Sequence, residues 1–264
     1  MANLVTDKSR LNDLLGNNRH APAADRLFRN RSVFFVGGAL PVYETLETMF
    51  DSFCTEATSL FFLTFGPRDT YSQGEEMARQ IKKNFHARLM AGFDPGVDSA
   101  TLERVYVAGV DNVVIQLDGS ALRQGSANLP AVLCFAKSIF PRWGTAAFLQ
   151  LGEESPGQSK KLIDRLLSEG IVPLVRFSGA AELSPEDVET VLQHLVAGWE
   201  RSSVPLQAYL PLISSMTPLV QDKPAGIFRG IVDRLRDRRQ LAESDIRRHL
   251  RVQRAEDSMD SAAL

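Results

Sequence analysis

The chain has 264 residues, of which 44% are hydrophobic and 23% charged. This composition is typical of a folded globular protein and excludes extended disorder. The 30 Lys and Arg residues are balanced by 32 Asp and Glu residues, which leaves a net charge of −2, whereas a general nucleic-acid binder is usually basic. No apolar run reaches the roughly 18 residues that a membrane helix needs, and the polar N-terminus lacks the apolar segment of a secretory signal. We therefore expect a cytoplasmic protein that binds neither nucleic acid nor a membrane.

Short runs rich in β-branched and aromatic residues recur along the chain, and each is followed by a segment with the apolar spacing of a helix. The runs start roughly 25 to 35 residues apart, which fits one strand–helix unit each. Several of them, such as residues 59–65, are almost continuously apolar, as strands buried on both faces of a parallel sheet are. The predicted strands are residues 32–36, 59–65, 87–93, 112–117, 145–151, 171–177 and 206–210, with a short eighth element near residues 213–219.

Capping residues mark several helix boundaries. Ser184, followed by Pro, Glu and Asp, predicts a helix start, and Asp98 predicts another. Gly109 and Gly170 lie between a predicted helix and the next strand, where a left-handed residue is needed. These units predict an α/β fold of the (β/α) TIM-barrel type, complete or incomplete. A doubly wound open sheet is the competing architecture.

Three regions are expected along the chain. Residues 1–30 are predicted to form a helical extension, residues 31–222 the barrel, and residues 223–264 a helical tail that packs on the barrel. The tail is rich in arginine, which fits either a solvated helix face or a helix that docks on a partner.

Ligands of a parallel barrel bind at the carboxyl ends of its strands, so the residues after each predicted strand are the candidate site residues. Glycine there lets a ligand approach the backbone, although a plain turn explains it equally well. An arginine at the end of a buried strand needs an internal acid or an anionic ligand as its partner. The candidate ligand-binding residues are Gly37, Gly38, Gly66, Pro67, Arg68, Asp69, Asp94, Gln116, Asp118, Gln150, Arg176 and Tyr209. Asp111 and Pro205, at the opposite strand ends, are expected to serve stability.

Metal-binding patterns are not visible in the sequence. The two cysteines, Cys54 and Cys134, are far apart, and neither has the spacing of a metal site. The four histidines are scattered as well. We therefore predict neither a metal site nor a disulfide framework.

Four segments near the predicted strand ends form an ordered set. They are Leu63-Thr-Phe-Gly-Pro-Arg-Asp-Thr-Tyr71, Ala108-Gly-Val-Asp-Asn-Val-Val-Ile-Gln-Leu-Asp118, Gly152-Glu-Glu-Ser-Pro-Gly-Gln158 and Ser215-Met-Thr-Pro-Leu219. In this order and spacing they resemble loops of the biotin-synthase-like radical S-adenosylmethionine (SAM) family, especially the branch with the hydrogenase maturase HydE and the pyrrolysine enzyme PylB. The resemblance spans roughly residues 31–219 and implies a radical-SAM-like barrel.

One departure from this family concerns its iron–sulfur cluster. The family holds a 4Fe–4S cluster through three cysteines after the first strand, but the matching stretch here, Phe34-Phe-Val-Gly-Gly-Ala-Leu-Pro-Val-Tyr43, has none. Such a cluster needs thiolate ligands, so we expect neither the cluster nor the radical reaction. The resemblance implies that Gly66 and Pro67 match the loop that holds the methionine end of S-adenosylmethionine. Asp118 stands where the family branch has Glu-Thr, so binding of S-adenosylmethionine stays open.

Two functional hypotheses follow. The first is a cluster-less barrel that serves as partner or scaffold of an authentic radical SAM enzyme, or as a small-molecule carrier, with self-association as the alternative partnership. The second is a non-radical lyase or transferase that uses Asp94, Asp118, Glu153 or Arg176. Two further alternatives are a cluster completed by a partner's cysteines and a phosphate-binding barrel enzyme, although residues 211–218 lack the glycines that the latter uses.

Overall fold

The computed structural model describes residues 4–16, 22–55, 57–117, 129–152, 154–177 and 184–221, together with residues 239, 242, 246 and 248. Its main sheet has seven strands in the order β2-β3-β4-β5-β6-β7-β8. Strand β2 is antiparallel to β3, and every later pair is parallel. The strands are β2 (Leu27–Asn30), β3 (Val33–Gly37), β4 (Leu60–Thr64), β5 (Arg88–Phe93), β6 (Asn112–Gln116), β7 (Thr145–Leu151) and β8 (Val172–Phe177).

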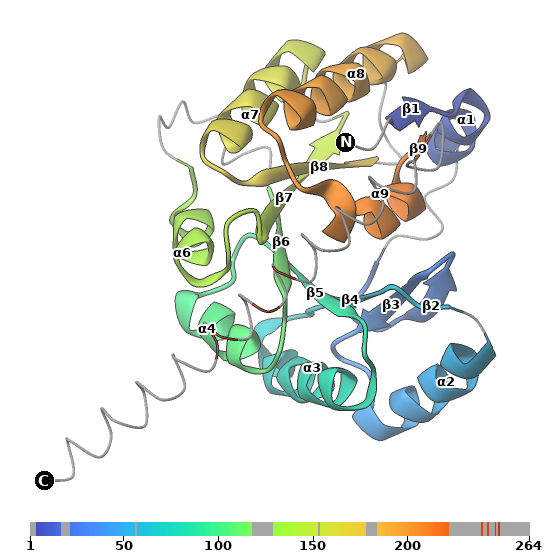
Figure 1. Cartoon of the computed structure of the whole chain (residues 1–264), viewed down its shortest axis with the longest axis vertical. Helices are drawn as coiled ribbons and strands as arrows, with labels where there is room; N and C mark the ends of the chain where they lie inside the picture. Colours follow the sequence, from blue (N-terminus) through green and yellow to red (C-terminus); the bar gives the residue numbers. More distant parts are fainter. Residues whose placement is uncertain are drawn as a thin grey trace, which may run out of the picture.

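The sheet curls into a half-barrel with helices along its outer side (Figure 1). A helix follows each of the strands β3 to β8. Helix α3 packs on α2 and α4, α6 packs on α4, and α7 packs on α8, the last pair most extensively. These helices cover the outer face of the central strands, and the curled sheet encloses the inner face, so the strands are apolar on both faces. The outer helices are α2 (Val42–Thr55), α3 (Tyr71–Asn84), α4 (Ser99–Val107), α6 (Ala131–Ile139), α7 (Pro156–Ser168) and α8 (Pro185–Arg201), with a short 3-10 helix η1 (Arg68–Thr70) before α3.

The predicted helix signals are confirmed. The Asp98 side chain accepts a hydrogen bond from the amide of Thr101 at the start of α4, and Ser184 accepts one from the amide of Asp187 at the start of α8. Gly109 and Gly170 have φ angles of 112° and 74°, a conformation that favours glycine. These residues fix where each helix begins and where the chain turns back into the sheet.

Six of the seven predicted strands are confirmed as β3 to β8, and the seventh is wrong. Residues 206–210 instead hold a 3-10 helix, η2 (Leu206–Ala208), and the first residue of helix α9 (Leu210–Met216). Pro211 lies in the first turn of α9, where its fixed φ and missing amide suit a helix start. The predicted eighth element is divided between α9 and strand β9 (Leu219–Gln221).

The fold is therefore a half-barrel rather than a complete TIM barrel in the part of the chain that the structure describes. Strand β9 does not join the main sheet but pairs with β1 (Leu4–Thr6), an antiparallel partner from the other end of the chain. The expected N-terminal extension is only partly helical: α1 (Lys8–Gly16) lies between β1 and β2, and β2 belongs to the main sheet. Phe28 helps to hold β2 in the main sheet, because its ring stacks on that of Phe35 of β3 with 4.8 Å between the ring centroids.

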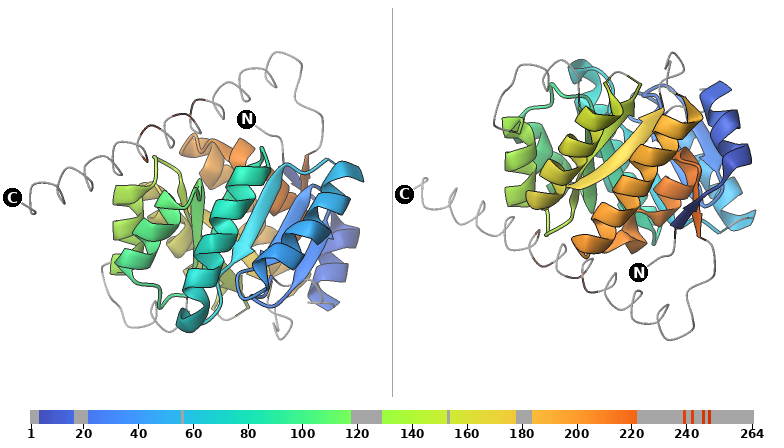
Figure 2. Two further views of the ribbon diagram at one scale, coloured as in Figure 1. Left: turned by 90° about the horizontal axis from the view of Figure 1, so that it is seen from below. Right: turned by 90° about the horizontal axis from the view of Figure 1, so that it is seen from above.

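Helix α9 closes the amino end of the half-barrel. It packs on β3 and β4 on the side of the sheet opposite α2 and α3 (Figures 1 and 2). Ser215 of α9 exchanges hydrogen bonds with Asn30, three residues before the start of β3.

Asp111 has the structural role that its position predicted. Its carboxylate is 3.0 Å from the Lys82 ammonium and accepts a hydrogen bond from the Leu89 amide. Arg248 from the C-terminal region lies 3.6 Å from the same carboxylate and also donates to the carbonyls of Tyr106 and Val110. None of the described helices is both long and apolar enough to cross a membrane.

Candidate functional site

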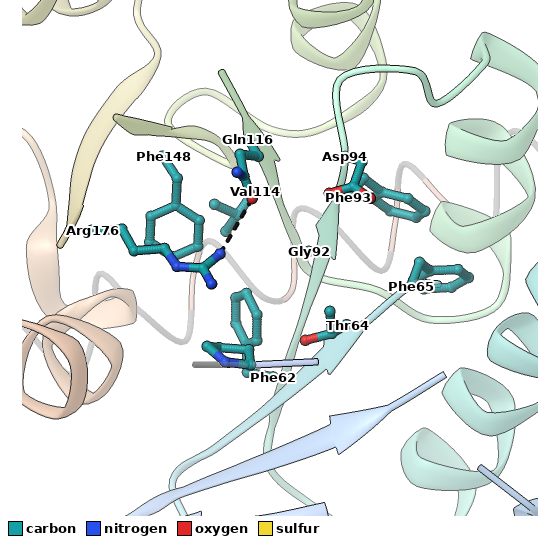
Figure 3. A pocket seen from close by; sticks show the side chains of 11 residues that line it. Phe62, Thr64, Phe65, Gly92, Phe93, Asp94, Val114, Gln116, Phe148 and Arg176 are labelled. Carbon is teal, nitrogen blue, oxygen red and sulfur yellow. Dashed lines mark hydrogen bonds between the residues drawn. The ribbon is translucent and has the colours of Figure 1, made fainter. Parts of the chain in front are cut away.

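A pocket lies on the inner face of the half-barrel, at the carboxyl ends of the strands (Figure 3). It holds about 320 Å³ of space free of protein atoms, part of it open to solvent. Its lining residues are Pro22, Phe62, Thr64, Phe65, Gly92, Phe93, Asp94, Val114, Gln116, Phe148 and Arg176.

Strand register brings most of these residues together. Thr64 of β4 pairs with Gly92 of β5, and Gly92 pairs in turn with Val114 of β6. Gln116, two residues further along β6, pairs with Phe148 of β7. Since side chains alternate between the two faces of a strand, the residues two positions apart on each strand share the inner face.

Arg176 is the dominant polar group of the pocket. It comes from β8, and its Nη1 donates to the Gln116 Oε1 at 3.2 Å (Figure 3). Burial lowers the pKa of the guanidinium, while the charge of Asp94 acts in the opposite direction. Arginine nevertheless stays charged in proteins. Within the described residues this cation has a neutral hydrogen-bond partner and forms no ion pair.

Asp94 and Thr64 complete the polar lining. Asp94 is exposed just after β5 and lies across the pocket from Arg176 (Figure 3). Thr64 is at the end of β4, and its Oγ1 is buried without a hydrogen-bond partner in the part of the chain that the structure describes. A buried hydroxyl without a partner is costly, so Thr64 offers an unused hydrogen-bonding group to a ligand.

Aromatic rings form the apolar walls. Phe62 and Phe148 lie with ring centroids 6.1 Å apart, and Phe65 stacks on Phe93 at 4.3 Å. Gly92 makes room for this arrangement, because a Cβ there would be 2.7 Å from the Phe62 ring. The described lining of the pocket is therefore mainly aromatic and carries one cation, Arg176, together with the polar side chains of Asp94, Gln116 and Thr64.

The candidate glycines Gly37 and Gly66 are covered by another segment of the chain. Residues 22–26, here called the strap, cross the carboxyl ends of β3 and β4. A Cβ on Gly37 would lie 2.1 Å from the Ala24 carbonyl oxygen, and one on Gly66 would lie 2.8 Å from the Ala24 Cβ. The Ala39 amide donates to the same Ala24 carbonyl at 2.9 Å. Packing of the strap accounts for both glycines without a ligand.

The neighbouring candidates also have partners within the chain. Gly38 donates its amide to the Thr64 carbonyl at 2.8 Å, and the Pro67 carbonyl accepts the amide of Thr70. Arg68 donates to the Gly96 carbonyl at 2.6 Å, away from the pocket lining. Asp69 is exposed on η1.

The remaining candidates are separated by the structure. Gln150 pairs with Arg176 in the sheet register but does not line the pocket. Asp118 and Glu153 lie outside the described residues. Cys134 is exposed on α6. Groups of three or more His, Cys, Asp or Glu side chains that could hold a metal ion do not occur among the described residues.

Tyr209 was expected at a strand carboxyl end, and this prediction is wrong. Its hydroxyl donates to the Trp143 carbonyl at 2.6 Å and accepts from the Asn112 amide at 3.1 Å. Asn112 begins β6, and its side-chain oxygen accepts from Arg88 at the start of β5. Tyr209 is thus buried at the amino end of the half-barrel, where burial raises the pKa of its hydroxyl. The error follows from reading a helix as the seventh strand.

Sequence reasoning found the charged and amide groups of the pocket and missed its other walls. Asp94, Gln116 and Arg176 follow from the strand-end rule. The missed residues are Pro22, Phe62, Thr64, Phe65, Gly92, Phe93, Val114 and Phe148. A glycine in the middle of a strand often marks a close approach, so Gly92 was the available signal.

Comparisons with known proteins add no family: no protein-family model and no curated protein matches this chain. Fold and site define only a class, that of an α/β half-barrel with a partly aromatic, arginine-containing pocket at the carboxyl ends of its strands.

Proposed function

We propose that this protein binds a small molecule in the Arg176 pocket and acts as a cytoplasmic carrier or ligand-dependent partner. One observation carries the proposal: Arg176 is partly buried on the inner face, and its hydrogen-bond partner among the described residues is the neutral Gln116. Removing a guanidinium from water costs free energy that a neutral amide offsets only in part. A ligand that supplies acceptor atoms would complete the site.

The radical-SAM-like sequence segments suggest the kind of partner. In this form of the hypothesis the chain is a cluster-less relative that carries a small molecule for an authentic radical SAM enzyme. The strap supports a carrier over an enzyme that cleaves S-adenosylmethionine, because Ala24 packs against Gly66, the glycine that the resemblance places at the methionine end of the cofactor.

The alternative of a non-radical enzyme has one favourable observation. Asp94 and Arg176, two of the four residues expected to perform such chemistry, line the same pocket from opposite sides. A carboxylate and a guanidinium so placed could polarise a substrate between them. Turnover of a bound compound would separate this enzyme from a carrier.

Ligand binding is tested on the purified full chain. Native mass spectrometry of the protein as isolated detects a retained small molecule, and a fragment screen by heteronuclear NMR locates binding. Compounds that bind should shift the resonances of Val114, Thr64 and Phe148 together. Screened compounds that leave all three unchanged, with no retained molecule in the mass spectrum, would contradict the proposed function.

The partner is tested separately by affinity capture of the full chain with and without the retained compound. A carrier or ligand-dependent partner should capture a radical SAM enzyme, recognisable by its iron–sulfur absorbance, in a ligand-dependent amount. Equal capture in both conditions, or none, contradicts the ligand-dependent partnership and leaves the pocket result standing.

A further inference from the structure

We infer that the ligand of the Arg176 pocket is a small monocarboxylate with an apolar or aromatic body. This inference rests on the proposed binding function and names its ligand class. It comes from the set of hydrogen-bonding groups, the balance of charge and the walls of the pocket.

The hydrogen-bonding groups match the two oxygens of a carboxylate. Guanidinium presents five N–H donors in a planar fork that pairs with carboxylates through two parallel bonds. Gln116 uses its amide oxygen toward Arg176, which leaves its NH₂ group as a donor. The buried Thr64 hydroxyl is a further group without a partner in the described chain.

The charge balance favours a single negative charge on the ligand. Arg176 is the cation in the described lining, and Asp94 is the anion. A monocarboxylate at the guanidinium would neutralise Arg176. The second charge of a phosphate dianion would face Asp94 without a matching cation, and like charges repel.

The walls determine the rest of the molecule. Phe62, Phe148 and Val114 surround the space next to the guanidinium (Figure 3). Apolar surface placed there is removed from water, which stabilises the complex by roughly 25 cal/mol per Å². A flat apolar body also suits the aromatic rings, which prefer offset or edge-on contacts. A purely polar anion would leave these walls without contacts.

The experiment compares acids with their neutral amides by isothermal titration calorimetry at pH 7. The probes are benzoate and benzamide, phenylacetate and phenylacetamide, cyclohexanecarboxylate and its amide, with acetate and inorganic phosphate alongside. The acid of at least one ring-bearing pair should bind at least tenfold more tightly than its amide, and more tightly than acetate or phosphate. Addition of the acid should also shift the NMR resonances of Val114 and Phe148, which would show that it occupies this pocket.

Three variants of the full chain complete the test. Arg176→Gln should reduce the preference of acid over amide to less than threefold, and Arg176→Lys should retain part of it because the charge is kept. Lys161→Gln, on the exposed side of α7, removes the same charge elsewhere and should leave binding unchanged. Thermal melting of each variant shows that it is folded, and the Lys variant keeps the test usable should the Gln variant unfold.

The inference is overturned if the amides bind as tightly as the acids, if phosphate binds more tightly than every carboxylate, or if no acid binds. It is overturned equally if Arg176→Gln keeps the full preference. Amides that bind in the pocket as tightly as acids would leave the proposed carrier function intact. Absence of every compound from the pocket in the NMR screen would remove that function as well.

Discussion

Gly37 has no room for a side chain, because the Ala24 carbonyl lies where its Cβ would be. The strap and strand β3 are thus in direct backbone contact. Gly37→Ala should lower the free energy of unfolding by about 3 kcal/mol, the upper part of the usual overpacking cost. Urea denaturation measures this loss.

Gly157→Ala is the matched control for this substitution. Gly157 lies in the first turn of α7 with no atom within 4 Å of a built Cβ. Alanine there should leave stability unchanged or raise it by about 0.5 kcal/mol, since glycine is disfavoured in helices. Equal stability of the two variants would show that the strap does not rest on β3 in solution.

Asp98 is a single capping residue whose effect depends on pH. Hydrogen bonds from the Thr101 backbone and side chain, in that order, hold the pKa of this carboxyl below its ordinary value of 3.8. A lowered folded-state pKa contributes stability that is present above the ordinary pKa and lost as the pH falls through the folded-state value. Asp98→Ala should therefore cost about 1 kcal/mol at pH 7.

The same comparison at acid pH checks the cause. Denaturation of the two proteins between pH 7 and pH 2 should show their difference shrinking once the pH falls below about 3.8. A difference that stays constant down to pH 2 would mean that the ionised carboxylate is not what stabilises the helix start.

At the scale of elements, Arg248 contacts the end of α4 and the turn between α4 and β6. Its guanidinium donates to two carbonyls, lies 3.6 Å from Asp111 and stands 5.2 Å from the Tyr106 ring centre. The side chain is 14% exposed, so these contacts are partly shielded from water. Arg248→Ala should lower the free energy of unfolding by about 2 kcal/mol, as loss of hydrogen bonds to a charged group does.

Arg239 serves as the control for Arg248 because it is exposed in the same region. Arg239→Ala should change stability by less than about 0.5 kcal/mol, the usual range for surface sites. Chemical denaturation of both variants makes the comparison. Similar effects of the two substitutions would contradict a specific role of Arg248.

The central strands could be predicted from the sequence because burial on both faces makes them continuously apolar, as in residues 60–64. A continuously apolar run does not indicate which of its side chains face inward, so the sequence does not assign Thr64 and Phe62 to the pocket. Residues 206–210 mimic a strand through Leu206 and Leu210, while the packing of α9 against β3 and β4 determines their helical state. Tertiary contacts of this kind override local propensity.

The candidate site was predictable where it depends on strand ends and unpredictable where it depends on distant segments. Arg176, Gln116 and Asp94 each lie at or just beyond the carboxyl end of an apolar strand, so the strand-end rule identifies them. The covering of Gly37 and Gly66 comes from Ala24, on a segment before the first predicted strand. Local patterns do not state which remote backbone will cover a glycine.

At the scale of the whole molecule, two short strands lie apart from the main sheet, in contact with α8 and α9. Strands β1 and β9 have three residues each and form a separate two-stranded sheet. Small sheets of this kind open more readily than a packed core. Hydrogen exchange followed by mass spectrometry should therefore show β1 and β9 exchanging well before β5, all of whose residues are buried.

Peptides that cover β4 and β6 provide the internal reference for this measurement, since both strands pair on two sides. They should exchange as slowly as β5. Equal protection of β1 and β5 would mean that the terminal pair belongs to the same cooperative unit as the central sheet.

The pairing of β1 with β9 also imposes an order on biosynthesis. Leu4 faces Gln221 across the pair, so β1 leaves the ribosome more than 200 residues before its partner strand. The curled sheet can assemble from successive strand–helix units as they emerge, but β1 has no partner until β9 has been synthesised. Pairing of β1 with β9 therefore follows the synthesis of all the strand–helix units that lie between them, and β1 stays unpaired during that time.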